Sequence, residues 1–166
     1  IRKGPTPSDV TLAAGNTYKL SGEYIVEEGA TLHIEEGVKI IAVYDDIADY
    51  ILVKQGGKIN AVGTPDKPIV MTSEKEEPGA WGGIHICGRA HTNAEGGKGS
   101  SEIGGAVYGG NDDADNSGTL QYIRLEYTGF AFDEEHEANG ISFYSVGNGT
   151  IVDHCQAYKG SDDGFE

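Results

Sequence analysis

The twelve residues GTLQYIRLEYTG, from Gly118 to Gly129, return in outline 31 positions later as GTIVDHCQAYKG, from Gly149 to Gly160. Both segments are short, rich in β-branched and aromatic residues, and bracketed by glycine, which is typical of strands and not of helices. The apolar positions of the two copies match best at an offset of 32, one more than the glycines suggest. That register places Leu120 over Val152, Ile123 over Cys155 and Leu125 over Ala157.

Shorter echoes extend this pattern toward the N-terminus. Gly29–Ile34 is repeated by Gly56–Val62, and Trp81–Ile86 corresponds to Asn139–Phe143. Glycines seven or eight residues apart leave no room for a crossover helix, so a doubly wound α/β fold is excluded. An antiparallel sandwich explains the short strands but not the echoes. We therefore predict an all-β chain that forms a right-handed parallel β-helix of about five coils, with one long Gly/Asp-rich loop.

The composition limits the partners and the stabilising devices. The chain has 166 residues, 26 of them glycine, and a formal net charge of −15, which repels the phosphates of nucleic acids. No stretch of sequence is long and apolar enough to predict a transmembrane segment. Cys87 and Cys155 do not occupy matching coil positions, so we expect no disulfide between them.

A single β-helix domain is expected over residues 1–166, with residues 1–16 as an N-terminal lead-in or cap. Residues 91–118 interrupt the repeat with almost no apolar content, and a loop excursion of this length is usually functional or flexible. The glycines within it are not followed by the Lys-Ser/Thr of a phosphate-binding loop, so no nucleotide or other cofactor-binding motif is found.

Several segments in the expected order resemble a family of secreted bacterial right-handed parallel β-helix proteins, common in Bacteroidetes, many of which look like cell-surface lipoproteins. The resemblance implies export, a surface or periplasm-facing address in bacteria, and contact with carbohydrate or matrix. The family pattern runs on beyond Glu166, so the chain looks like an N-terminal fragment, and any lipid anchor would lie upstream of Ile1. The segments that carry the resemblance are Trp81–Ile84, Gly109–Gly118, Tyr122–Gly129, Asn139–Ile141 and Ser161–Glu166.

The strongest candidate metal site lies at the end of the loop excursion. Hard oxygen donors at alternating positions followed by glycine suit calcium, which prefers clustered carboxylates. An EF-hand is excluded, because the twelfth position counted from Asp113 is Arg124. The alternative is an ordinary solvated turn. The candidate ligands are Asp112, Asp113, Asp115, Asn116 and Ser117.

A secondary acidic cluster follows strand-like sequence at Asp133, Glu134, Glu135, His136 and Glu137. Adjacent carboxylates repel, so two such clusters that met at one corner of the solenoid would create a cation site; the other candidates are Asp45–Asp49 and Asp162–Asp163. A solvated acidic surface is the alternative reading of each.

His85, Cys87 and His91 are zinc-type ligands at close spacing, with no fourth ligand apparent, and Cys87 is expected instead to pack as a small apolar side chain. Trp81 is expected to be buried in the core.

Three functions remain open from the sequence. We expect an exported structural or binding module with no enzymatic activity, stabilised by a cation and in contact with a surface polysaccharide or another protein. The first alternative is a polysaccharide lyase or hydrolase, with Arg124 and Glu126 projecting outward from one strand beside the acidic loop. The second is a subunit of a fibre that associates through an open C-terminal coil.

Overall fold

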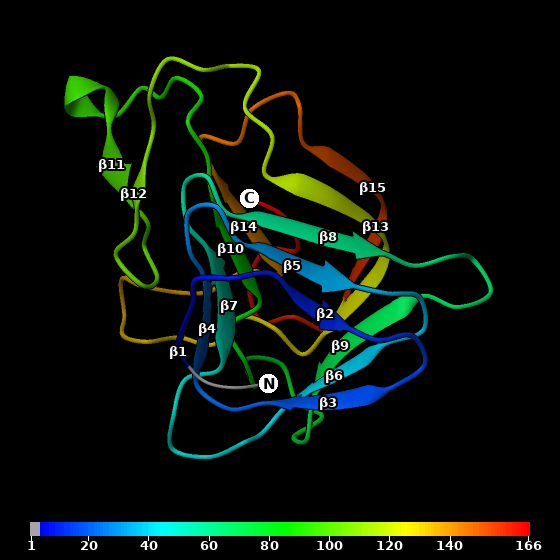
Figure 1. The fold of residues 1–166 in the computed structure, drawn as a ribbon. Coiled ribbons are helices and arrows are strands. Elements are labelled where there is room, and N and C mark those ends of the chain that lie inside the picture. The colour runs from blue at the N-terminus through cyan, green and yellow to red at the C-terminus, as the bar shows by residue number, and fades with distance from the viewer. Residues whose placement is uncertain (1–3) are drawn as a thin grey trace.

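The computed structural model describes residues 4–166, and its chain winds into a right-handed parallel β-helix with three faces (Figure 1). We call the five-stranded sheet of β1, β4, β7, β10 and β14 sheet A. The next strand of each coil lies on face B, and the one after it on face C. The predicted fold class is confirmed, and the only helix in the described residues is the short 3-10 turn η1, Glu95–Gly97.

The strands are short, and they recur in the same order in each coil. Sheet A contains β1 Gly4–Thr6, β4 Glu23–Val26, β7 Tyr50–Val53, β10 Ile84–Cys87 and β14 Ile141–Tyr144. Face B contains β2 Val10–Leu12, β5 Thr31–Ile34 and β8 Lys58–Val62, and face C contains β3 Thr17–Leu20, β6 Lys39–Ala42 and β9 Ile69–Ser73. In the last two coils one bent strand crosses both faces, as β13 Gly118–Glu126 and β15 Ile151–Tyr158.

The register follows the offset of 32 predicted from the sequence. β13 pairs in parallel with β15, with Leu120 opposite Val152 and Ile123 opposite Cys155. The other echoes are confirmed too, since Leu32 pairs with Ile59 and Ile84 with Ile141. A parallel solenoid keeps equivalent side chains about 4.8 Å apart along its axis, so a repeat in the sequence becomes a stack in space.

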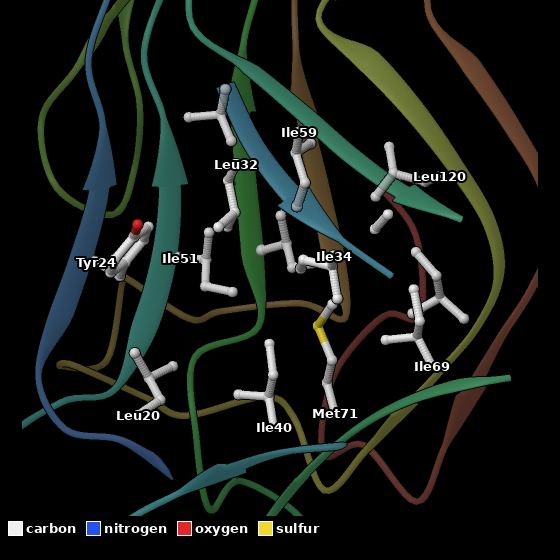
Figure 2. Packing of buried hydrophobic residues seen from close by; sticks show 14 of the residues in the cluster. Leu20, Tyr24, Leu32, Ile34, Ile40, Ile51, Ile59, Ile69, Met71 and Leu120 are labelled. Carbon is white, nitrogen blue, oxygen red and sulfur yellow. The ribbon is translucent and has the colours of Figure 1, made fainter. Parts of the chain in front are cut away.

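The core consists of these stacks (Figure 2). On faces B and C, alternate residues of the strands up to β13 point inward and are more buried than their neighbours, whereas all four residues of β7 and of β10 on sheet A are buried. On face B, Leu12, Ile34, Ala61 and Leu120 follow one another from coil to coil, each at most 4% exposed. Trp81 is also buried, and its indole Nε1 donates to the carbonyl of Glu126 at 2.7 Å.

Residues 4–16 are part of the first coil, because β1 pairs with β4 and β2 pairs with β5. The predicted lead-in or cap is thus, from residue 4 onward, formed by two strands of the β-helix, and residues 1–3 lie outside the described residues. No helix among the described residues is long and apolar enough to cross a membrane.

Candidate functional site

The long excursion between β10 and β13 packs against the outer face of sheet A. It carries η1 and a small antiparallel pair, β11 Gly99–Ser100 with β12 Val107–Tyr108. Ile103 and Ala106 are buried and join an outer cluster with residues of sheet A. The low apolar content of this segment therefore does not leave it detached from the solenoid, because its few apolar residues pack against sheet A. The sheet A side chains in this outer cluster include Tyr50, Leu52 and Cys87.

The excursion creates a groove along the ends of β4 and β7, which we call the loop groove. It consists of two adjoining hollows of about 340 and 450 Å³ that share Gln55. The Gln55 amide donates to the carbonyls of Gly88 and Gly109 at 2.7 and 2.8 Å, which ties the start of the excursion and its return segment to the solenoid. The first hollow is lined by Glu27, Glu28, Lys54, Gln55, Gly105, Ala106 and Val107, and the second by Gln55, Arg89, Lys98, Gly109, Gly110, Asn111 and Asp112.

Charges in the loop groove are largely paired. Lys54 Nζ lies 2.8 Å from Glu27 Oε1, and Arg89 Nη2 lies 2.5 Å from Glu28 Oε1. Lys98, from the excursion, is exposed and makes no ion pair within the part of the chain that the structure describes. The groove thus presents positively and negatively charged groups that can form hydrogen bonds, together with the unpaired ammonium of Lys98.

The predicted calcium ligands border this groove, but their oxygens bind backbone amides. Asp113 Oδ1 accepts from the His91 backbone N–H at 2.9 Å and contacts its Nδ1 at 2.7 Å, and these bonds lower the pKa of Asp113. Asp115 Oδ2 accepts from Arg89 N–H at 2.7 Å. These bonds pin the segment to the start of the excursion. Among the other three, Asp112 Oδ1 accepts from Ala114 N–H, Asn116 Oδ1 accepts from Gly118 N–H, and Ser117 is buried.

Residues 4–166 contain no group of three or more His, Cys, Asp or Glu side chains placed to hold a metal ion. The five predicted ligands are neighbours, but their donor atoms point to different backbone partners and do not converge. Calcium would have to displace Asp113 and Asp115 from these bonds, so calcium binding stays a prediction.

Two of the acidic clusters meet. The Glu137 carboxyl hydrogen-bonds that of Asp162, and this bond, together with the charge of Glu102, raises the pKa of Glu137. Its backbone N–H also donates to Glu102 Oε1 at 3.2 Å. Glu134 and Glu135 are exposed, and His136 pairs with Asp133 at 2.7 Å within the same loop. The structure therefore brings Glu137 of the predicted secondary cluster to Asp162, on one side of sheet A.

Arg124 and Glu126 project outward from face C, as expected. Arg124 Nε contacts Glu126 Oε1 at 2.6 Å, and its guanidinium carbon lies 4.2 Å from the centroid of the Tyr158 ring. Thr72 donates to Glu126 Oε2 at 2.9 Å. Both charged groups are thus occupied by a network on the sheet surface, and Asp112–Asp115 lies in the excursion, away from it.

The cysteines are free and the zinc-type residues do not assemble. His85 and Cys87 share the outer face of β10, whereas His91 binds Asp113. Cys87 packs in the outer cluster and not in the main core, and burial raises the pKa of its thiol to about 11. His85 is buried, its Nε2 contacts the Gly82 carbonyl at 2.7 Å, and burial lowers its pKa to about 4.

Aromatic residues scattered along the sequence form a row of rings along the outer face of sheet A. Phe130, Phe132, Tyr50, His85, Tyr144 and Tyr108 follow one another with centroid separations between 4.9 and 6.2 Å. These rings come from five separate segments, so spacing along the chain gave no signal. Only the register of the coils brings them together.

The chain matches, over residues 4–166, the family described as the pectate-lyase like beta helix domain. Because the match covers all of the described chain, the protein belongs to this family. No curated protein and no solved structure gives a match.

Proposed function

We propose that the protein is an exported bacterial cell-surface module that binds polysaccharide through the loop groove and catalyses no reaction. The observation that carries this proposal is the groove itself, formed by an excursion of 30 residues that, within residues 4–166, a single coil possesses. Ordering such a segment costs conformational entropy, which indicates a function beyond stabilising the solenoid.

The lining of the groove suits a hydroxyl-rich polymer. Paired charges and the polar side chains present donors and acceptors to sugar hydroxyls, and Lys98 adds a cation for an acidic residue of the polymer. Membership of the pectate-lyase like family supports a carbohydrate-related role. In this proposal, calcium stiffens the Asp112–Ser117 segment at the border of the groove.

The test is affinity electrophoresis in gels that contain polygalacturonate, alginate or xylan. We expect retardation by at least one polymer, with about tenfold weaker binding when Arg89→Ala and Lys98→Ala are combined. The matched control, Lys39→Ala with Lys58→Ala, removes two positive charges from the strands of other faces. Equal retardation of the two double variants would place binding outside the groove.

The enzymatic alternative has one candidate group, the Glu137 carboxyl, because its contact with the Asp162 carboxyl raises its pKa and a carboxyl that stays protonated can act as a general acid. Release of reducing ends, or of unsaturated products that absorb in the ultraviolet, from the same three polymers would establish it. Loss of that activity in Glu137→Gln would assign the carboxyl.

A further inference from the structure

A third hollow lies on the outer face of sheet A, at the end of β4 and β7 opposite to the loop groove. Its volume is about 290 Å³, and we call it the Glu23 hollow. The excursion separates it from the loop groove, because Gly104 sits so close to Leu52, in the middle of β7, that an added Cβ would lie 2.7 Å from Leu52 Cδ2. The hollow is lined by Glu23, Ile47, Ala48, Tyr50 and Phe132.

Glu23 brings an uncompensated negative charge to this hollow. Its Oε2 accepts a hydrogen bond from the Tyr50 hydroxyl at 2.8 Å, and no ion pair to Glu23 occurs among residues 4–166. Burial and this bond raise the pKa of Tyr50, so its hydroxyl stays a donor. Glu27, which follows β4 at its other end, differs from Glu23 because the charge of its carboxylate is neutralised by Lys54. The carboxylate at the Glu23 end therefore has one oxygen oriented by the protein and one available to a ligand.

Phe132 supplies the apolar wall. Its ring is 4.9 Å from that of Phe130 and 5.9 Å from that of Tyr50, both edge to face, yet the side chain is 39% exposed. The loop that carries it is fixed, since Phe132 N–H donates to the His136 carbonyl at 2.8 Å and the Asp133 carboxylate holds the His136 ring. A ring that is both exposed and held in place presents a surface for contact with a ligand.

An available carboxylate beside aromatic faces selects a cation with an apolar or ring-shaped body. The ammonium donates to the carboxylate and is attracted to the ring faces, while the C–H surface of the body packs on the ring. The net charge of −15 adds to this preference and disfavours an anionic sugar at the same place. We propose that the Glu23 hollow binds a sugar with a protonated amine, such as a glucosamine unit of a de-N-acetylated polymer. This goes beyond the proposed function, since it concerns a separate hollow and holds even if the loop groove binds no polymer.

The experiment is isothermal titration calorimetry with three oligosaccharides of equal length, made of glucosamine, N-acetylglucosamine or glucose. We expect the glucosamine oligomer to bind at least about tenfold more tightly than the other two. The affinity of the glucosamine oligomer should fall once the pH exceeds the pKa of its amine, because the amine then loses its positive charge. Glu23→Gln, which keeps an acceptor for Tyr50, should weaken glucosamine binding about tenfold, and Phe132→Ala about fivefold.

Two control variants match these changes elsewhere on the molecule. Asp66→Asn removes one exposed carboxylate from the loop between β8 and β9, and Val62→Ala truncates a side chain that is 43% exposed. If Glu23→Gln fails to fold, as judged by circular dichroism, the exposed Phe132→Ala carries the test.

Equal affinity for the three oligosaccharides, or equal effects of Glu23→Gln and Asp66→Asn, would overturn the proposal. Nα-acetyl-lysine amide, which keeps its side-chain ammonium, is a further probe. If it binds as tightly as a glucosamine unit, the proposal is overturned in favour of a protein ligand that presents lysine.

Discussion

Tyr122 and His154 stack with ring centroids 4.5 Å apart at corresponding positions of successive coils, and both have left-handed backbone conformations, with φ of 51° and 50°. They mark the corner at which β13 and β15 turn from face B to face C. In the second coil the same corner is a longer turn with Gly37 at φ 69°. The later coils thus replace a glycine turn by a single strained residue, whose ring contacts its counterpart in the next coil.

Substitution of Tyr122 separates the strain from the stacking. Tyr122→Ala keeps the left-handed strain and loses the stack, so it should lower the free energy of unfolding by about 2 kcal/mol. Tyr122→Gly loses the stack but relieves the strain, so we expect it to be about 1 kcal/mol more stable than Tyr122→Ala. Urea denaturation followed by fluorescence measures both, and equal stabilities would show that the backbone is not strained there.

Gly118 should be intolerant of any side chain. An added Cβ would lie 1.9 Å from the carbonyl oxygen of Ile59, and the backbone φ is 117°. We expect Gly118→Ala to destabilise the protein by at least about 3 kcal/mol. Gly96 is the control, because it also has a positive φ, 74°, but has nothing within 4 Å of the added atom. Gly96→Ala should therefore cost only about 1 kcal/mol in thermal or urea unfolding.

The sequence predicted the fold well because a solenoid converts a repeat in sequence directly into contacts in space. The offset of 32 between Leu120 and Val152 sufficed to give the register of β13 with β15. It did not predict that residues 4–16 form strands, since the first coil is shorter than those that follow and shows no echo. A prediction from internal repeats is least reliable where the number of residues per coil changes.

The candidate site was predicted less well for a physical reason. Acidic residues that are adjacent in the chain, such as Asp113 and Asp115, attract attention in a sequence, yet their oxygens bind nearby backbone amides. The Glu23 hollow combines residues from three coils, and only the superposition of strands reveals it. Coil-to-coil neighbours were predictable only where the repeat was visible.

Asp49 should make stability depend on pH. Burial, followed by the charges of Asp45 and Glu74, raises its pKa from 3.8 to about 6, although its Oδ1 accepts from Gly22 N–H at 2.6 Å. The folded state therefore holds the proton more tightly than the unfolded state. The protonated Asp49 carboxyl therefore contributes to the free energy of unfolding. This stabilisation is fully present below the pKa that Asp49 has in the unfolded state, and it is lost as the pH rises through about 6. Asp49→Asn, which keeps an acceptor for Gly22, should be more stable than the wild type by about 2 kcal/mol near pH 8 and no more stable below pH 4. Urea titrations at the two pH values check this, and a difference that does not change with pH would contradict it.

Calcium should stabilise the protein weakly if it binds the loop excursion. Because Asp113 and Asp115 must exchange backbone amides for the ion, we expect a dissociation constant of about 1 mM. Calcium at about 10 mM would then add roughly 1.4 kcal/mol to the free energy of unfolding, a rise of about 4 °C in melting temperature. A chelator should reverse the rise, and Asp113→Asn should abolish it. Magnesium is the control ion, and an equal shift with magnesium would indicate general screening of acidic charge.

The edge of β15 should promote association. Val152 occupies the core position of Leu120 one coil later, but it is 42% exposed where Leu120 is fully buried, and the neighbouring Ile151 is 50% exposed. Within residues 4–166, β15 pairs only with β13, and in this 166-residue chain a strand edge left unpaired beside exposed apolar side chains is a template for pairing with another chain. We therefore expect the average mass in sedimentation equilibrium to rise with concentration, and Val152→Lys to suppress that rise. Val62→Lys is the matched control, because Val62 is equally exposed, at 43%, but lies away from this edge on β8, between β5 and β13. A concentration-independent monomer, or equal suppression by both variants, would show that this edge does not drive association.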